Sequence, residues 1–127
     1  MDQAVLYQVL NQDFLDTLLP AETSDQFFEA LYGDAKDGAY DIRLEYISAN
    51  EKRIVLAFNL TQRPGKCLVC SLTYGLPKVF SRHPLINVDG MIEKLGAKDI
   101  QIKSWRMGET EEQTPQLHSI PLYLELE

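Results

Sequence analysis

The stretch YDIRLEYISANEKRIVLAFNL, residues 40–60, decides the fold class. In its first part, apolar Tyr40, Ile42 and Leu44 alternate with charged residues, which is the pattern of a strand with one buried face. The second part, RIVLAFNL, is apolar on both faces and therefore predicts a strand inside the sheet. SANEK between the two parts predicts a hairpin connection, so we expect neighbouring strands to be antiparallel.

Three more strands are expected further along the chain. They are CLVCSLTY (67–74), DIQIKSWRM (99–107) and HSIPLYLEL (118–126). Pro121 lacks the N–H that a strand ladder needs, so the last strand is expected at a sheet edge or with that position turned outward.

Helices are expected before the first strand and between the third and fourth strands. The helical segments are 11–19, 23–32 and a short one over 88–95 with Asn87 as its N-cap. Residues 1–10 either extend the first helix backward or form an extended arm. This order predicts an α+β fold of two layers. It consists of a mainly antiparallel five-stranded sheet, N-terminal helices and one short helix between strands 3 and 4.

Size and charge limit the class of protein. The 127 residues suit a single domain over 1–127, in which the final pair, 126–127, could be the scar of an expression tag. A net charge of −7 disfavours nucleic acid and anionic membranes as partners, although residues 61–107 are net basic. No apolar run is long enough to span a membrane, and the N-terminus does not resemble a signal peptide. The sequence therefore predicts a cytoplasmic protein with reduced cysteines.

The two cysteines form a CxxC pattern inside the predicted third strand. Residues three apart in a strand point to opposite faces, so Cys67 and Cys70 are poorly placed to meet each other or one metal ion. Together with His83 they imitate three ligands of a zinc finger, but His118 lies too far along the chain to be the fourth. We expect buried structural thiols, and neither a metal site nor a cofactor.

The segment before the short helix is the first candidate site. Lys78, Arg82 and His83 precede a helix whose N-terminus begins at Asn87, and basic side chains beside a helix N-terminus can hold a phosphate or carboxylate. The alternative is that the segment only connects two elements, with His83 helping to satisfy its backbone.

A second candidate is an interface formed by Tyr74, Trp105 and Arg106. Trp and Arg are frequent in interface hot spots, and an outward Trp105 would form one patch with the loop after Tyr74. The alternative is that Trp105 belongs to the core or the sheet surface.

Known catalytic motifs do not indicate an enzyme class for this sequence. The sequence contains no G-x-S-x-G, P-loop, G-x-G-x-x-G or H-E-x-x-H pattern, so no catalytic residues are assigned. We therefore expect a non-catalytic protein-binding or interaction module that forms a homodimer or binds another protein. The alternative left open is a small anionic-ligand-binding domain, or an enzyme, that uses the segment before the short helix.

Two resemblances accompany this interpretation. GAYDIRLEY (38–46) and QRPGKCLVCSLTYGLPKVFSRHPLIN (62–87) resemble segments of a family of small uncharacterised bacterial proteins, which implies no activity or site residue. The predicted element order is similar to that of type III secretion chaperones. Those are cytoplasmic dimers that bind an extended segment of an effector, so this resemblance implies a protein-binding role.

Overall fold

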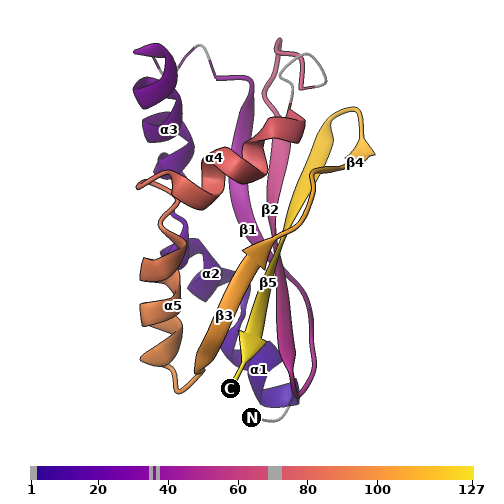
Figure 1. Ribbon diagram of the computed structural model, residues 1–127. Coiled ribbons are helices and arrows are strands. Elements are labelled where there is room, and N and C mark those ends of the chain that lie inside the picture. The colour runs from indigo at the N-terminus through magenta and orange to yellow at the C-terminus, as the bar shows by residue number, and fades with distance from the viewer. Residues whose placement is uncertain (1–2, 35, 37, 69–72) are drawn as a thin grey trace.

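The computed structural model describes residues 3–34, 36, 38–68 and 73–127. In this part of the chain, a five-stranded antiparallel sheet forms one layer and helices form the other, which confirms the α+β prediction (Figure 1). The helices are α1 (Gln3–Val9), α2 (Gln12–Leu18), α3 (Glu22–Tyr32), the 3-10 helix η3 (Thr73–Gly75), α4 (Leu76–Arg82) and α5 (Val88–Gly96). The strands are β1 (Tyr40–Ala49), β2 (Arg53–Gln62), β3 (Ile102–Met107), β4 (Glu111–Thr114) and β5 (Leu117–Leu126).

The strands are ordered β1-β2-β5-β3, and β4 pairs with β5 beyond the end of β3. Strand β5 is therefore central, so the first of the two alternatives for Pro121, an edge strand, is wrong. The carbonyl of Pro121 accepts a hydrogen bond from the Gly108 N–H at 2.9 Å. In an antiparallel strand the N and O of one residue point to the same side, so the missing N–H of Pro121 faces the break between β3 and β4. The proline is tolerated because its neighbouring strand is interrupted there.

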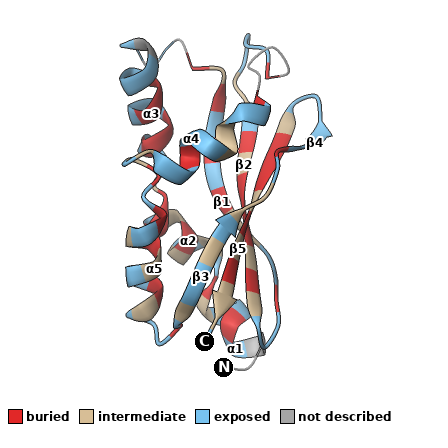
Figure 2. Ribbon diagram, in the orientation of Figure 1, coloured by how far each residue is buried: buried red, intermediate tan, exposed pale blue. Residues whose placement is uncertain are grey.

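The core lies between the sheet and the helices (Figure 2). The alternate β2 side chains Ile54, Leu56, Phe58 and Leu60 are all fully buried. The ring of Phe80 in α4 packs edge to face on Phe58, with centroids 5.5 Å apart, and makes a matching contact with Phe27 of α3. Full burial of one such side chain stabilises the fold by about 1.5–3 kcal/mol, so α4 is firmly fixed to the sheet.

The predicted third strand over 67–74 is not found in the described residues. Cys67 and Leu68 are outside any strand, Thr73–Gly75 is a 3-10 helix that leads into α4, and residues 69–72 lie outside the described part. Pro77 suits the first turn of α4, where its missing N–H costs nothing. The remaining strand is instead β4, which lies between the predicted strands 99–107 and 118–126, where no strand was expected.

The N-terminal segment is a helix and not an extended arm. Leu6 and Leu10 lie one turn apart and are buried in the core. Helix α1 is separate from α2, since Asn11 caps α2 by accepting a hydrogen bond from the Phe14 N–H at 2.9 Å. The predicted helices α2, α3 and α5 are confirmed, as is Asn87 as the N-cap of α5.

Candidate functional site

A cleft of about 700 Å³ lies at the edge of the sheet where β3 gives way to β4. One wall comes from η3 and the start of α4, the opposite wall is the run from Arg106 to Glu111, and Pro121 and Tyr123 of β5 also line it. Its size falls in the range typical of ligand sites. A Cβ atom on Gly108 would lie 2.6 Å from Cγ of Pro121, so glycine allows the chain to bend closely around β5 at this point.

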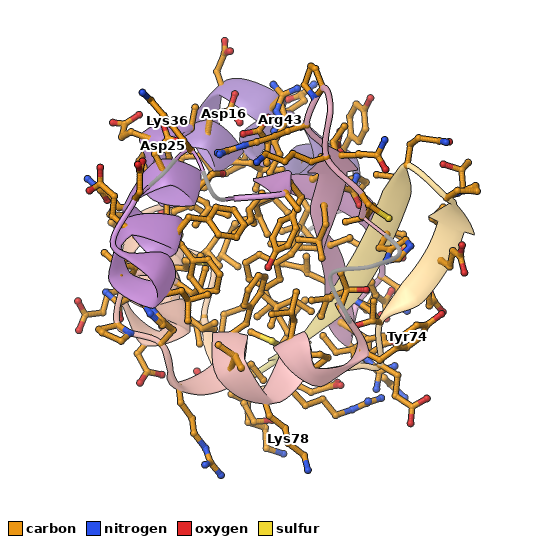
Figure 3. The ribbon with its side chains drawn as sticks, turned by 90° about the horizontal axis from the view of Figure 1, so that it is seen from above. Asp16, Asp25, Lys36, Arg43, Tyr74 and Lys78 are labelled. Carbon is orange, nitrogen blue, oxygen red and sulfur yellow. The ribbon has the colours of Figure 1, made fainter. Side chains whose placement is uncertain are left out.

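The walls of the cleft combine aromatic and charged side chains. Tyr74 is 64% exposed although it is a large aromatic residue. The guanidinium of Arg106 lies 4.2 Å from the centroid of the Tyr123 ring, which is a cation–π contact. Lys78 projects from α4 on the side of the molecule opposite Arg43 (Figure 3). Two further lining residues, Glu109 and Glu111, balance the two positive charges.

A buried polar group holds the η3 wall in place. His118 of β5 is 2% exposed, and its Nδ1 lies 2.6 Å from Oγ1 of Thr73, the residue before Tyr74. The Thr110 hydroxyl donates to the Thr73 carbonyl at 2.8 Å. These contacts tie η3 to β5 and to the β3–β4 turn, and so fix the position of Tyr74.

The same group resembles a nucleophile–base–acid arrangement but cannot work as one. His118 Nε2 has no hydrogen-bond partner among the described residues, and Glu112 Oε1 is 3.9 Å away. Thr73, in the place of a nucleophile, is only 1% exposed. A nucleophile must contact its substrate, and Thr73 is closed off from solvent.

Of the predicted interface residues, Tyr74 and Arg106 both line the cleft, whereas Trp105 does not. Trp105 lies opposite Leu124 in the ladder, so its ring faces the helix layer, and its Nε1–H donates to Asp89 of α5 at 3.3 Å. This is the alternative role, in which Trp105 packs against the core. Tyr123 was missed by the sequence analysis. The alternation of the last strand could have identified it, since Tyr123 falls on the face opposite Leu122 and Leu124.

The four predicted ligand residues have different surroundings. Lys78 lines the cleft, and Arg82 is exposed in the last turn of α4. The His83 ring centroid lies 4.9 Å from that of Phe27, and its Nδ1 accepts a bond from the Leu85 N–H at 3.2 Å. Asn87 is occupied as the cap of α5, through a bond from the Gly90 N–H. The alternative role of His83, satisfying its own backbone, is therefore the one observed.

The cysteine prediction needs a correction. Cys67 is exposed and disulfide-bonded, so the expectation of a buried reduced thiol is wrong for this residue. Cys70 lies outside the described residues. The argument from opposite strand faces failed because Cys67 is not in a strand. No group of three or more His, Cys, Asp or Glu side chains in the described ranges could hold a metal ion.

On the outer edge of β1, at the other side of the sheet, helix side chains bond backbone groups in the middle of the strand. Ser24 Oγ, from α3, accepts a hydrogen bond from the Ile42 N–H at 2.8 Å and donates to the Ile42 carbonyl at 3.4 Å. Gln12, from α2, donates to the Leu44 carbonyl at 2.8 Å. These are the backbone groups that an incoming strand would need.

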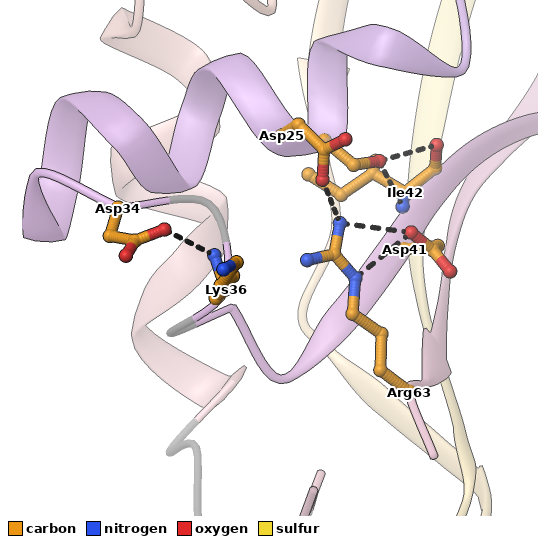
Figure 4. Close-up of polar contacts among 7 residues, drawn as sticks. Asp25, Asp34, Lys36, Asp41, Ile42 and Arg63 are labelled. Carbon is orange, nitrogen blue, oxygen red and sulfur yellow. Dashed lines mark hydrogen bonds and ion pairs between the residues drawn. The ribbon is translucent and has the colours of Figure 1, made fainter.

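Ion pairs strengthen the same edge. Nη2 of Arg63 lies 2.7 Å from Asp25 of α3 and 3.0 Å from Asp41 of β1 (Figure 4). Arg43 of β1 pairs with Asp16 of α2 at 3.1 Å. The middle of the β1 edge, around Ile42 and Leu44, is therefore an internal contact of the fold.

No known family model matches the chain, and no curated protein or solved structure matches it either. The likeness to type III secretion chaperones depended on three consecutive strands followed by one helix. The observed order has two strands followed by α4 and α5, so this likeness loses its basis. None of the described helices is long and apolar enough to cross a membrane.

Proposed function

We propose that the protein is a non-catalytic binding module whose site is the cleft between η3–α4 and the β3–β4 turn. The observation that carries this proposal is the pair of tyrosines that line it, Tyr74 and Tyr123, with Arg106 stacked on the latter. Tyr and Arg, with Trp, are the side chains enriched in binding hot spots. Because the Tyr74 ring is largely exposed, a partner that covers it removes apolar surface from water, which favours binding.

Triad-type nucleophilic catalysis has no support in the cleft. The described residues that line it include no histidine, cysteine or serine. Its one hydroxyl-bearing aliphatic residue, Thr110, is buried and bonded to the Thr73 carbonyl. The reactive-looking group behind the wall is closed to solvent by the burial of Thr73.

The sequence also suggested an anion site before α5, and this candidate has less support. Asp89 places a carboxylate in the first turn of α5, where it competes with any bound anion for the positive end of the helix dipole. Asn87 already uses one free N–H of that turn.

The proposed partner is therefore a protein segment. A cytoplasmic location stays a prediction.

A peptide selection tests the proposal. Random short peptides displayed on phage are selected on the wild-type protein, and the affinity of the recovered peptides is measured by titration calorimetry. Tyr74→Ala is expected to weaken binding by about tenfold or more, the size of a hot-spot loss. Tyr7→Ala is the matched control, because Tyr7 is 65% exposed and belongs to α1. Recovery of no binding peptide, or equal affinity for wild type and Tyr74→Ala, overturns the proposal.

A further inference from the structure

The buried histidine behind the cleft uses one of its two ring nitrogens and leaves the other without a partner. His118 Nδ1 lies 2.6 Å from Oγ1 of Thr73, whereas Nε2 has no hydrogen-bond partner among the described residues. Buried polar atoms are nearly always paired, so an exception calls for a physical reason. His118 does not line the cleft, so contact with a bound partner does not supply that reason.

A carboxylate lies next to the unpaired nitrogen. Glu112 of β4 is directly opposite His118 in the β4–β5 ladder, and its Oε1 is 3.9 Å from Nε2. This separation exceeds that of a hydrogen bond, which is about 2.7–3.2 Å. The Glu112 side chain is 41% exposed and makes no other ion pair in the described part of the chain, so it can move toward the ring without breaking one.

Protonation of His118 would satisfy the unpaired nitrogen. A neutral imidazole carries one N–H, whereas an imidazolium carries one on each nitrogen. Nδ1–H can then donate to the Thr73 hydroxyl, which accepts as well as donates, and Nε2–H can donate to the Glu112 carboxylate. A buried charge is costly unless it is paired, and Glu112 provides the opposite charge. Histidine is the side chain whose charge ordinarily changes between about pH 5 and pH 8.

No second ionised group competes for His118 within the described ranges. The groups that face it from the other elements are uncharged between about pH 5 and pH 8, namely Leu60 of β2, Thr73 of η3 and the Tyr74 ring with its centroid 6.4 Å away. Glu111 is the neighbour of Glu112 in β4, and neighbours in a strand point to opposite faces. The α4 cations Lys78 and Arg82 make no ion pair with Glu112.

The His118–Glu112 pair would connect the elements that form the cleft walls. His118 of β5 is bonded to Thr73, the residue before Tyr74. Glu112 lies two residues after Thr110, whose hydroxyl donates to the Thr73 carbonyl at 2.8 Å. Closing the pair therefore adds one more bond to a set that already holds η3 between β5 and the start of β4. The position of Tyr74 depends on that set.

We propose that His118 and Glu112 form a pH-sensitive contact that controls the cleft. As the pH falls from about 8 to about 5, His118 takes up a proton from solvent, pairs with Glu112 and holds η3 and Tyr74 in the binding arrangement. At the upper end of this range Nε2 is unpaired and the η3 wall is held less firmly. The contact depends on His118 and Glu112 alone, and its effect on binding rests on the proposed function.

An NMR titration of the full-length protein between about pH 8 and pH 5 tests the contact. Both ring nitrogens of His118 are expected to become protonated, and the Thr73 and Tyr74 amide signals are expected to shift with the same midpoint. Hydrogen exchange of these amides, corrected for the intrinsic effect of pH, is expected to be slower in acid. Glu112→Gln is expected to move the midpoint to lower pH and to abolish the slower exchange, because glutamine cannot supply the opposite charge.

Two variants serve as controls. His83 is the second of the two histidines in the chain, and its Nδ1 accepts a bond from the Leu85 N–H. His83→Gln is therefore expected to leave the titration of the Tyr74 amide unchanged. Glu29→Gln removes the same charge as Glu112→Gln from an exposed position of α3 and is also expected to leave it unchanged.

The effect on binding is measured with the peptides recovered in the phage selection. Their affinity for the wild type is expected to be about two- to fivefold higher at pH 5 than at pH 8, the size expected of a partly exposed ion pair. For Glu112→Gln the ratio is expected to be lower by that factor. Comparing the two proteins with one peptide cancels the titration of the peptide itself.

The outcomes distinguish the inference from the proposed function. The contact is overturned if His118 stays neutral, if it titrates identically in Glu112→Gln, or if acid speeds exchange at Tyr74. Peptides that bind through Tyr74 would then still support the cleft as a binding site. The same pH ratio of affinities for wild type and Glu112→Gln overturns the control of binding. A contact that forms while no peptide binds at either pH overturns the proposed function and leaves the contact confirmed.

Discussion

Ser24→Ala is the sharpest test of how the middle of the β1 edge is closed. Ser24 is 1% exposed, and its hydroxyl bonds both the N–H and the carbonyl of Ile42, which is itself buried. The alanine variant keeps the helix but leaves two buried backbone groups of β1 without these partners. Only the hydroxyl is lost, so the change isolates the cost of that pairing.

The size of the effect follows from two opposing terms. Leaving a buried polar group unsatisfied costs about 1–3 kcal/mol. Alanine favours helix over serine by about 0.5 kcal/mol, which offsets part of this cost. The expected net loss in the free energy of unfolding is therefore about 1–2 kcal/mol. For a chain of 127 residues, each kcal/mol lowers the Tm by about 4 °C.

Urea denaturation followed by circular dichroism measures this loss, with Ser81→Ala as the matched control. Ser81 also lies in a helix, but it is exposed and its hydroxyl donates to the Pro77 carbonyl of the same helix. Ser81→Ala is expected to change stability by less than about 0.5 kcal/mol, as surface substitutions usually do. If Ser24→Ala is no more destabilising than Ser81→Ala, the Ser24 hydroxyl does not stabilise the β1 edge, and this reasoning is refuted.

Two further predictions concern the break in the sheet and the β1 edge. Gly108→Ala is expected to destabilise the fold by about 1–3 kcal/mol in urea denaturation, because its Cβ would lie 2.6 Å from Pro121 Cγ; an unchanged midpoint would contradict the close approach. Hydrogen bonds from Arg43 and then Gln12 lower the pKa of Asp16 in the folded protein. Its stabilising effect is therefore full above the unfolded-state pKa and lost as pH falls through the folded pKa. Asp16→Asn should cost at most about 1 kcal/mol at pH 7, because the pair is exposed, and the difference from wild type should shrink in acid; a constant difference would refute the pairing.

The sheet could be predicted wherever the side-chain pattern is decided locally. Strands β1 and β2 were found because Ile42, Leu44, Leu56 and Phe58 alternate with residues of the other face, and each is buried as expected. The hairpin between them then fixes the antiparallel pairing. Helix α5 was found for the same reason, since its N-cap and its apolar face lie within a few residues of each other.

The segment 73–82 shows where local pattern is insufficient. CLVCSLTY has strong strand propensity, yet Thr73–Gly75 is helical and continues into α4. The decisive contact is Phe80, which packs between Phe27 and Phe58 from distant parts of the chain. Propensity is a weak preference that such tertiary burial overrides. For the same reason Tyr74 was expected at the end of a strand, whereas it lies in the 3-10 helix that leads into α4.

The cleft depends on a strand break that the sequence marks only indirectly. Gly108 and Pro121 are far apart in sequence, and each alone indicates no more than a turn or an edge. They meet because the β4–β5 hairpin folds the chain back on itself, which places the missing N–H of Pro121 opposite the bend at Gly108. A proline in a central strand is tolerated where the neighbouring strand is interrupted. Here the interruption leaves the cleft that Tyr74, Lys78 and Arg106 line. Pro121, which looked unfavourable in a strand, is therefore the residue on which the candidate site depends.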